Sequence, residues 1–238
     1  MLKIEHLTKH YPGSDKGVTD LCLHVESGSI CAFIGPNGAG KTTTLKCIVG
    51  LHDFEEGAVT VCGHDVKREP LACKRSLAYL PDDPELFDYL TGSQYLSFVA
   101  DVFGVSDAER KTRIGELAGR FELTEELPQL ISGYSHGMKQ KLALISAFLH
   151  DPQLLILDEP FVGLDPSAAI TVRELMNDLR KRGGAVLFST HVLEVAEKLC
   201  SHVAILKDGR LVRSGPMESV LRPGVTLEDI FLEVAERG

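Results

Sequence analysis

The stretch that decides the fold is Ser29-Ile-Cys-Ala-Phe-Ile-Gly-Pro-Asn-Gly-Ala-Gly-Lys-Thr42. Its apolar run, residues 30–34, stops at Gly35, and residues 35–42 then match the pattern G-x-x-x-x-G-K-[ST] at every fixed position. Residues 42–49, which follow, have a helical pattern. This order of strand, loop and helix is the setting that the pattern needs in order to bind phosphate. We therefore predict a phosphate-binding loop (residues 35–42) in an α/β protein.

The residue types of this loop suit a polyphosphate. Its glycines allow successive backbone N–H groups to point into one hollow, and the helix that follows adds its positive N-terminal end. Lys41 supplies a full positive charge for the β- and γ-phosphates, and the hydroxyl of Thr42 can bind Mg²⁺. The expected nucleotide contacts are Gly35, Pro36, Asn37, Gly38, Ala39, Gly40, Lys41, Thr42 and Thr43.

Acidic and histidine side chains follow two other apolar runs. Asp158 and Glu159 come directly after residues 154–157, and His191 comes soon after residues 185–189. Because ligands of α/β sheets bind at the carboxyl ends of strands, these side chains are expected near the phosphate-binding loop. Asp158 would then help to hold Mg²⁺, Glu159 would be the general base, and His191 would contact the γ-phosphate. The alternative is that the carboxylates begin a solvated turn and that His191 is structural.

The rest of the chain alternates short apolar runs with helical patterns, which indicates an α/β core with a largely parallel sheet. The predicted strands are rich in Val, Ile, Leu and Phe, a composition typical of strands buried on both faces. Their ranges are 21–25, 30–34, 58–61, 77–80, 154–157, 185–189, 203–206 and 210–212.

The stretch from about residue 83 to 151 has no convincing strand. It holds three predicted helices, near 91–103, 107–121 and 135–150, two of which begin with a Ser/Thr-x-x-Glu/Gln pattern at Thr91 and Ser106. We expect one compact unit, residues 1–238, in which a helical insertion (83–151) interrupts an α/β core (1–82 and 152–238).

Composition limits the partners and the compartment. The formal net charge of −9, with no basic run to offset it, disfavours nucleic acid as the main partner. The six cysteines form no C-x-x-C pair, and those in apolar runs, such as Cys31, are expected to be small buried hydrophobes in a reducing compartment. The apolar runs are far too short to span a membrane, and the N-terminus lacks the layout of a signal peptide. A soluble, cytoplasmic protein is expected.

With these motifs in order, the chain resembles the ATP-binding subunits of ABC transporters over essentially its whole length. The segment Gly133-Tyr-Ser-His-Gly-Met-Lys-Gln-Lys141 looks like the signature sequence of that family and is called the signature segment below. Gly163-Leu-Asp165 looks like the family's D-loop, which implies that Asp165 contacts the nucleotide. His191 looks like the family's switch histidine, and Tyr11 like the aromatic residue that stacks on adenine. The resemblance implies an ABC-type ATPase with a mostly parallel core sheet, an antiparallel β portion and an inserted helical subdomain.

The resemblance also implies Mg²⁺-dependent hydrolysis of ATP in a head-to-tail dimer, with either an identical chain or a paralogous ATPase. One chain's phosphate-binding loop would then share ATP with Ser135 and Gly137 of the other. Ser135 falls at a predicted helix N-terminus, where its hydroxyl and the helix dipole could meet a γ-phosphate, although it could also be an ordinary helix cap.

Two positions depart from the family pattern. The usual signature is Leu-Ser-Gly-Gly-Gln, whereas residues 134–138 read Tyr-Ser-His-Gly-Met. The family usually places Gln where this chain has Asp82. We expect Asp82 to act through a Mg²⁺-bound water, because its direct approach to the γ-phosphate would be repulsive. Asp83 is the alternative at that site, and a solvated Pro-Asp-Asp-Pro turn is the other alternative.

The resemblance implies that the chain couples ATP hydrolysis to solute transport by a separate integral-membrane permease, at the cytoplasmic face of the membrane. The aromatic residues of 86–98 are expected to pack within the helical region or to line a groove for a permease helix. The tail, residues 225–234, looks like that of ATPases serving ABC-2-type exporters. The alternatives are a soluble ABC ATPase acting on nucleic acid or a protein complex, and a nucleotide-binding regulator without turnover.

Overall fold

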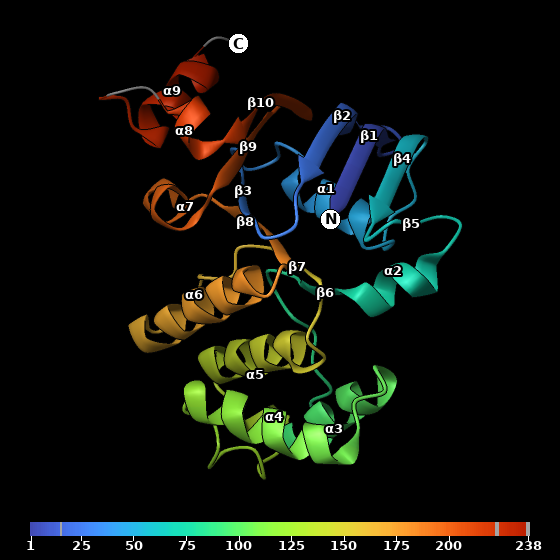
Figure 1. Ribbon diagram of the computed structural model, residues 1–238, viewed down its shortest axis with the longest axis vertical. Coiled ribbons are helices and arrows are strands. Elements are labelled where there is room, and N and C mark those ends of the chain that lie inside the picture. Colours follow the sequence, from blue (N-terminus) through green and yellow to red (C-terminus); the bar gives the residue numbers. More distant parts are fainter. Residues whose placement is uncertain (15, 222–223, 237–238) are drawn as a thin grey trace.

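The computed structural model describes residues 1–14, 16–221 and 224–236, and in this part of the chain the strands form two sheets (Figure 1). The larger sheet has the order β10-β9-β3-β8-β7-β6. Its strands are β6 (Leu77–Leu80), β7 (Leu154–Leu157), β8 (Ala185–Thr190), β3 (Ile30–Ile34), β9 (His202–Lys207) and β10 (Arg210–Pro216). All neighbours are parallel except β10, which runs antiparallel to β9. The predicted α/β class with a largely parallel sheet is confirmed.

The register of the parallel strands brings their carboxyl ends to one edge. Leu80 lies opposite Leu157, Leu157 opposite Phe188, and Ile34 opposite Thr190. The segments that follow these strands therefore begin side by side, as the sequence predicted for the phosphate-binding loop, the two carboxylates and His191.

The smaller sheet is antiparallel and has the order β2-β1-β4-β5. Its strands are β1 (Leu2–His10), β2 (Gly17–Val25), β4 (Glu56–Val61) and β5 (His64–Asp65). The predicted burial on both faces is wrong for β2, β4 and β10. Buried and more exposed positions largely alternate along β2 and β4, and no residue of β10 is buried. Strand β1 was not predicted, since it alternates in the same way and contains no continuous apolar run.

Strand β3 separates two hydrophobic layers. Ile30, Ala32 and Ile34 belong to the layer between the larger sheet and the helices, which include α5 and α6. Cys31 and Phe33 point the other way, into the layer between the two sheets. Because both sides of β3 are covered, all five of its residues are apolar and buried.

Three long helices lie together at the lower end of Figure 1, where α5 contacts α3, α4, α6 and β6. They are α3 (Gly92–Val102), α4 (Asp107–Arg120) and α5 (His136–Leu149), with a short 3₁₀ turn, Ile131–Gly133, before α5. Thr91 and Gln94 form the predicted capping box of α3, and the side chain of Ser106 caps α4. The three predicted helices of this stretch are thus confirmed.

The remaining helices connect strands of the core or end the chain. They are α1 (Lys41–Ile48), α2 (Pro70–Ser76), α6 (Pro166–Lys181), α7 (Leu193–Leu199), α8 (Met217–Val220) and α9 (Leu227–Glu236). Among the residues described, no helix combines the length and the apolarity that crossing a membrane requires.

All six cysteines are free. Cys31, Cys47, Cys73 and Cys200 are buried, as expected, and burial raises the pKa of the Cys31 thiol to about 12. Cys22 is exposed, so the prediction of small buried hydrophobes does not extend to it.

Candidate nucleotide-binding site

The phosphate-binding loop joins β3 to α1, and its tight path requires glycine at two positions. Gly40 precedes α1 with φ +101°, a left-handed conformation that a side chain disfavours. A Cβ on Gly40 would also lie 2.5 Å from the side chain of Val18. At Gly35 a Cβ would lie 2.6 Å from the carbonyl oxygen of Leu206. The loop therefore packs directly against neighbouring strands and opens away from them.

Lys41 is held by the loop itself. Its ammonium donates to the carbonyl oxygens of Gly35 at 2.7 Å and Pro36 at 3.3 Å, and the residue is 7% exposed. Burial lowers the pKa of Lys41 from its usual value, while the charges of Glu159 and Asp158 oppose that shift. The positive charge thus lies between the loop and the two predicted carboxylates.

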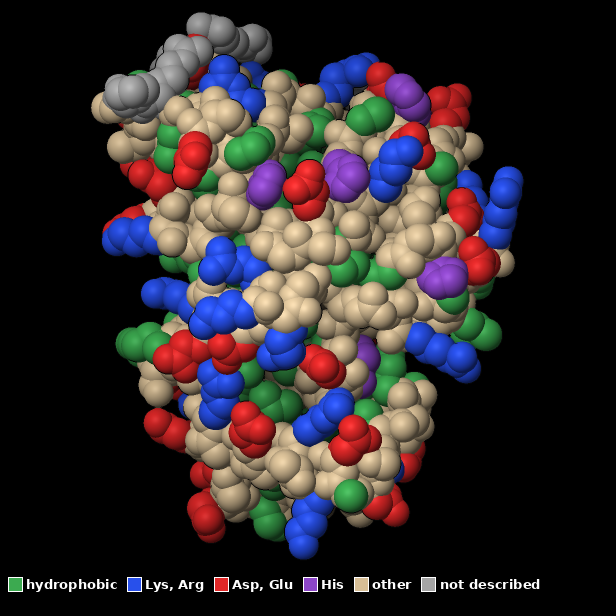
Figure 2. Space-filling model, in the orientation of Figure 1, with side chains coloured by type: hydrophobic (Ala, Val, Ile, Leu, Met, Phe, Trp, Pro, Cys, Tyr) green, Lys and Arg blue, Asp and Glu red, His purple; other side chains and the backbone are tan. Residues whose placement is uncertain are grey.

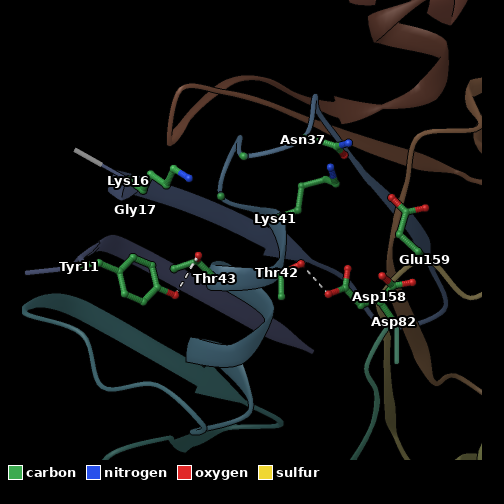
Figure 3. Close-up of a pocket in the computed structure, with 12 residues that line it drawn as sticks. Tyr11, Lys16, Gly17, Asn37, Lys41, Thr42, Thr43, Asp82, Asp158 and Glu159 are labelled. Atoms are coloured by element: carbon green, nitrogen blue, oxygen red, sulfur yellow. Dashed lines mark hydrogen bonds between the residues drawn. The ribbon is translucent and has the colours of Figure 1, made fainter. Parts of the chain in front are cut away.

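Asp158 is buried between two hydroxyl groups. Thr42 donates to one carboxylate oxygen at 2.7 Å, shown as a dashed line in Figure 3, and Ser189 donates to the other at 2.5 Å. The hydroxyl oxygen of Ser189 also accepts the backbone N–H of Glu159 at 2.9 Å. Ser189 therefore positions both consecutive acidic residues at the end of β7.

Glu159 and His191 form a pair at the same edge of the sheet. The Nδ1 atom of His191 lies 2.9 Å from Oε2 of Glu159, so a proton on Nδ1 would be donated to the carboxylate. The Glu159 side chain is 15% exposed and that of His191 is 62% exposed. Glu159 also has φ +48°, a backbone conformation uncommon for a residue with a side chain. The geometry is that of a carboxylate oriented by an imidazole.

Tyr11 stands at the opposite end of the pocket, after β1. Its hydroxyl lies 3.2 Å from that of Thr43, and its ring meets His52 edge to face at 5.9 Å. Figure 3 shows Tyr11 on one side of the pocket, Asp82, Asp158 and Glu159 on the other, and Lys41 between them.

These parts enclose a pocket of about 240 Å³ that brings most of the predicted site residues together. Its lining residues are Tyr11, Lys16, Gly17, Asn37, Gly38, Gly40, Lys41, Thr42, Thr43, Asp82, Asp158 and Glu159. Asp82 thus reaches the pocket, whereas Asp83 does not line it. Pro36, Ala39 and Gly35 belong to the loop without lining the pocket, and His191 reaches it only through Glu159.

Ser135, Gly137 and Asp165 do not line this pocket. Ser135 caps α5, with its hydroxyl 3.3 Å from the N–H of Met138. Asp165 caps α6 by accepting the N–H of Ala168 at 2.8 Å. The predicted contact of these residues with the nucleotide of a second chain stays a prediction.

The signature segment and the Gly163 loop touch each other. A Cβ on Gly163 would lie 2.9 Å from Nε2 of His136, so the imidazole packs against this glycine. Asp165, from the same loop, also pairs with Lys141 of α5 at 2.7 Å. The unusual His136 therefore contacts the D-loop-like segment of its own chain.

Sequence reasoning missed three residues of the site: Ser189, Lys16 and Gly17. Ser189 directly precedes the Thr-His pair at the end of β8, and this adjacency was the available signal. Lys16 and Gly17 reach the pocket only because β1 and β2 pair as a hairpin, which brings residue 17 opposite His10.

Comparison with known proteins gives the family. The family model described as ABC transporter matches residues 18–162. The chain belongs to the ABC transporter family. It is an ATP-binding subunit of that family.

Curated relatives and solved structures agree with this assignment. The ATP-binding protein NatA of Bacillus subtilis is 33% identical to this ABC subunit, over 94% of this chain and 92% of its own. YxlF of Bacillus subtilis, an uncharacterized ABC transporter ATP-binding protein, is 39% identical over 92% of this chain and 72% of its own. A solved ATP-binding subunit of an ABC transporter is 35% identical, with a TM-score of 0.95 over 99% of this chain and 100% of its own.

A more distant structure, a dimeric ATP-binding cassette bound to ADP and Pi, is 23% identical with a TM-score of 0.83 over 91% of this chain and 99% of its own. At 23% identity, this similarity shows that the two proteins share a fold and nothing more. It agrees with the predicted ABC-type fold.

Proposed function

We propose that this ABC subunit hydrolyses ATP with Glu159 as the general base. The observation that carries the proposal is that the Glu159 carboxylate, paired with His191 at 2.9 Å, opens onto the same pocket as Lys41. A water molecule attacking the γ-phosphate gives up its proton to this carboxylate. His191 orients the carboxylate through this contact.

Lys41 changes partners when nucleotide binds. Its ammonium now donates to the carbonyl oxygens of Gly35 and Pro36, which are neutral acceptors. Phosphate oxygens carry full negative charge and are stronger acceptors. Lys41 therefore turns from the loop carbonyls to the β- and γ-phosphates, where its charge stabilises the transition state.

The oxygen atoms beside Lys41 fit Mg²⁺. Thr42 and Asp158 present a hydroxyl and a carboxylate 2.7 Å apart, and Asp82 adds a second carboxylate to the same pocket. Mg²⁺ prefers oxygen ligands and uses only one or two carboxylates at phosphate sites. When bound, the ion supplies positive charge that offsets the charge of the β- and γ-phosphates. Thr42 and Asp158 would hold it directly, and Asp82 through a water.

Replacing Glu159 by Gln tests the mechanism. The amide keeps the size of the side chain but cannot take a proton, so we expect kcat for ATP to fall about 10²- to 10⁴-fold. Affinity for ATP measured by calorimetry with Mg²⁺ should be retained. Glu218→Gln, a surface change on α8, is the matched control and should leave kcat unchanged. Parental turnover in Glu159→Gln would exclude this residue as the base.

We also propose that the chain forms a head-to-tail dimer with a copy of itself or a paralogue. In this dimer Ser135 contacts the γ-phosphate of the ATP that the partner holds. Ser135 is exposed at the N-terminus of α5, whose dipole favours an anion. Gly137, in the first turn of α5, lets the partner's phosphate approach the helix backbone. Asp165 lies beside this segment through Lys141 and would face the same interface.

Ser135→Asp distinguishes a phosphate contact of residue 135 from simple helix capping. Asp and Ser are equally good helix caps, but the charge of Asp repels phosphate. In the Glu159→Gln background, we expect ATP with Mg²⁺ to produce a dimer by light scattering and Ser135→Asp to abolish it. The control is Ser106→Asp, the same change at the cap of α4, which should leave the dimer intact. Equal dimerisation of both variants would limit Ser135 to capping.

We propose that the permease docks in an apolar groove between α2, β6, α3 and α5, at the cytoplasmic face of the membrane. The groove encloses about 530 Å³ and contains Leu71, Tyr79, Tyr95 and Val102 among its lining residues. Tyr95 also touches Phe87 of an exposed aromatic cluster that includes Tyr89 and Phe98. The groove and this cluster are therefore continuous.

The polar groups of this groove indicate the chemistry of its occupant. Lys74 and Arg75 line it without an ion pair among the described residues. The hydroxyl of Tyr79 is buried without a hydrogen-bond partner. Both features are complementary to a carboxylate. The occupant we propose is a short permease helix with aliphatic side chains and one acidic residue.

The helical stretch 83–151 would move as a subdomain relative to residues 1–82 and 152–238, carrying Ser135 toward the partner on closure. The assignment to ABC-2-type exporters rests on the resemblance of the tail, of Asp82 at the usual Gln position and of the signature residues 134–138 to that subgroup. In the tail, Thr226 and Asp229 cap α9, with the N–H of Thr226 donating to Asp229 at 2.8 Å and that of Asp229 to Thr226 at 3.2 Å. The same contacts suit any capped surface helix.

The rival, an ABC ATPase that acts on nucleic acid or a protein complex, has little support in the charge distribution. The formal net charge is −9, and the Lys and Arg side chains that gather across the middle of the face in Figure 2 lie beside Asp and Glu side chains. Purification of the chain from a detergent extract distinguishes the two functions. A stoichiometric integral-membrane partner supports transport, whereas co-purification of a ribosome or DNA supports the rival.

A further inference from the structure

Three side chains with metal-binding atoms meet on the exposed face of the β1–β2 hairpin. Nδ1 of His6 lies 2.6 Å from a carboxylate oxygen of Asp20 and 3.7 Å from the sulfur of Cys22. Possible ligand atoms of the three residues all lie within 4.8 Å of one another. None of them lines the nucleotide pocket, and the mechanism above does not use them.

Two irregularities of the strand pairing bring these side chains together. Between the pairs Ile4–Leu23 and Leu7–Leu21, two residues of β1 lie opposite one residue of β2. Between the pairs Leu7–Leu21 and Lys9–Val18, two residues of β2 lie opposite one residue of β1. His6 and Asp20 fall in these two bulges, with φ +51° and +53°. Bulges redirect side chains, and here His6 joins Asp20 and Cys22 on the outer face.

The spacing of nitrogen and sulfur is that of two ligands on one tetrahedral metal. With metal bonds of about 2.0 Å to imidazole nitrogen and about 2.3 Å to thiolate sulfur, the tetrahedral angle separates the two atoms by about 3.5 Å. The separation here is 3.7 Å. The backbone N–H of His6 also donates to the sulfur at 3.2 Å, which fixes its position.

The carboxylate needs a small adjustment. Two ligands at about 2.0 Å would lie about 3.3 Å apart, more than the 2.6 Å between the hydrogen-bonded atoms of His6 and Asp20. Their side chains are 77% and 62% exposed, so both can move apart without disturbing the core. The metal would take the place of the hydrogen between His6 and Asp20 and of the thiol hydrogen of Cys22.

We propose that His6, Asp20 and Cys22 form a surface site for a divalent transition metal of the Zn²⁺ type, with the fourth position open to water. Thiolate, imidazole and carboxylate together favour Zn²⁺ or Co²⁺ over Mg²⁺, which selects oxygen ligands. The site is distinct from the oxygen atoms of Thr42 and Asp158. It also lies on the hairpin that presents Tyr11 and Lys16 to the nucleotide pocket.

The test uses the full chain, reduced, without a histidine tag and stripped of metal. Titration with Co²⁺ should give one equivalent of binding with a sulfur-to-cobalt charge-transfer band, which an all-oxygen site cannot produce, and Zn²⁺ should displace it. Cys22→Ser should remove the band, and His6→Asn and Asp20→Asn should weaken binding at least about tenfold. Cys62→Ser, a change of the half-buried cysteine, is the matched control and should keep the band.

A second measurement needs no variant: Zn²⁺ should protect Cys22 from alkylation, read by mass spectrometry of the peptide. Absence of a charge-transfer band in the parent chain would overturn the proposal. So would a band that survives in Cys22→Ser, or alkylation of Cys22 at the same rate with and without Zn²⁺.

Discussion

At the scale of single residues, Ser189 joins the two acidic residues of the site. Its hydroxyl donates to Asp158 at 2.5 Å and accepts the N–H of Glu159 at 2.9 Å. Ser189 is fully buried, so neither contact can be replaced by bulk water.

Ser189→Ala should therefore reduce both stability and turnover. We expect a loss of about 1–3 kcal/mol in the free energy of unfolding, because a buried carboxylate oxygen and an N–H lose a partner. In steady-state ATPase assays kcat should fall more than the apparent affinity for ATP, since Glu159 is misplaced while the phosphate-binding loop is intact. Ser219→Ala, on the surface of α8, should change neither quantity. An unaltered kcat in Ser189→Ala would show that Glu159 is positioned by other contacts.

Most of the pocket could be predicted from sequence because its residues are consecutive. Lys41 and Thr42 belong to one loop, and Asp158 and Glu159 are neighbours at a strand end. Ser189 could not be assigned in this way, because its contact with Asp158 depends on the pairing of β7 with β8, where Leu157 lies opposite Phe188. Roles that depend on strand register are invisible until the sheet order is known.

At the scale of elements, the capping box of α3 was predicted and is present. The hydroxyl of Thr91 accepts the N–H of Gln94 at 3.2 Å, and the Gln94 side chain accepts the N–H of Thr91 at 2.9 Å. Both contacts arise within four consecutive residues, which is why sequence alone suffices.

Thr91→Ala should lower the free energy of unfolding by about 1 kcal/mol, as measured by urea denaturation, because the N–H of Gln94 loses its acceptor. Amide exchange of the first turn of α3 should speed up, while ATP binding should not change. Thr112→Ala supplies the contrast: the same substitution in the interior of α4 should be neutral or slightly stabilising, because Ala favours helix. Equal effects of both substitutions would mean that the cap contributes nothing.

Strand prediction succeeded or failed according to the environment of each strand. The buried runs of β3, β6 and β7 were predicted with their observed bounds, because both faces are covered and the residues are uniformly apolar. In the antiparallel sheet, β1 was missed and the predicted start of β2 was four residues late. Their outward positions are polar, so no apolar run marks them.

At the scale of the whole molecule, the groove beside α2 should matter only when the permease is present. Leu71 is 71% exposed at this groove, so Leu71→Asp should leave the fold and basal ATPase intact. The added charge should repel the acidic permease helix that we propose, and stoichiometric co-purification with the permease should be lost. Tyr79→Phe should weaken this association while preserving the apolar surface.

The control for the groove is Leu232→Asp on α9, which is also an exposed leucine and should keep the permease bound. Retained association in Leu71→Asp would place the permease elsewhere. A change in the oligomeric state of the isolated chain would instead assign the groove to a second copy.

The central position of β3 has a further consequence for how this chain can vary in length. Because successive residues of β3 enter opposite layers, inserting one residue before Ala32 would send Ala32 into the space of Phe33 and Phe33 into the space of Ile34, in the opposite layer. The same insertion would displace the phosphate-binding loop from Asp158 by about 3.3 Å. Insertions and deletions are therefore tolerable in surface turns, such as residues 12–14 of the β1–β2 hairpin, and not in the strand that leads to the nucleotide.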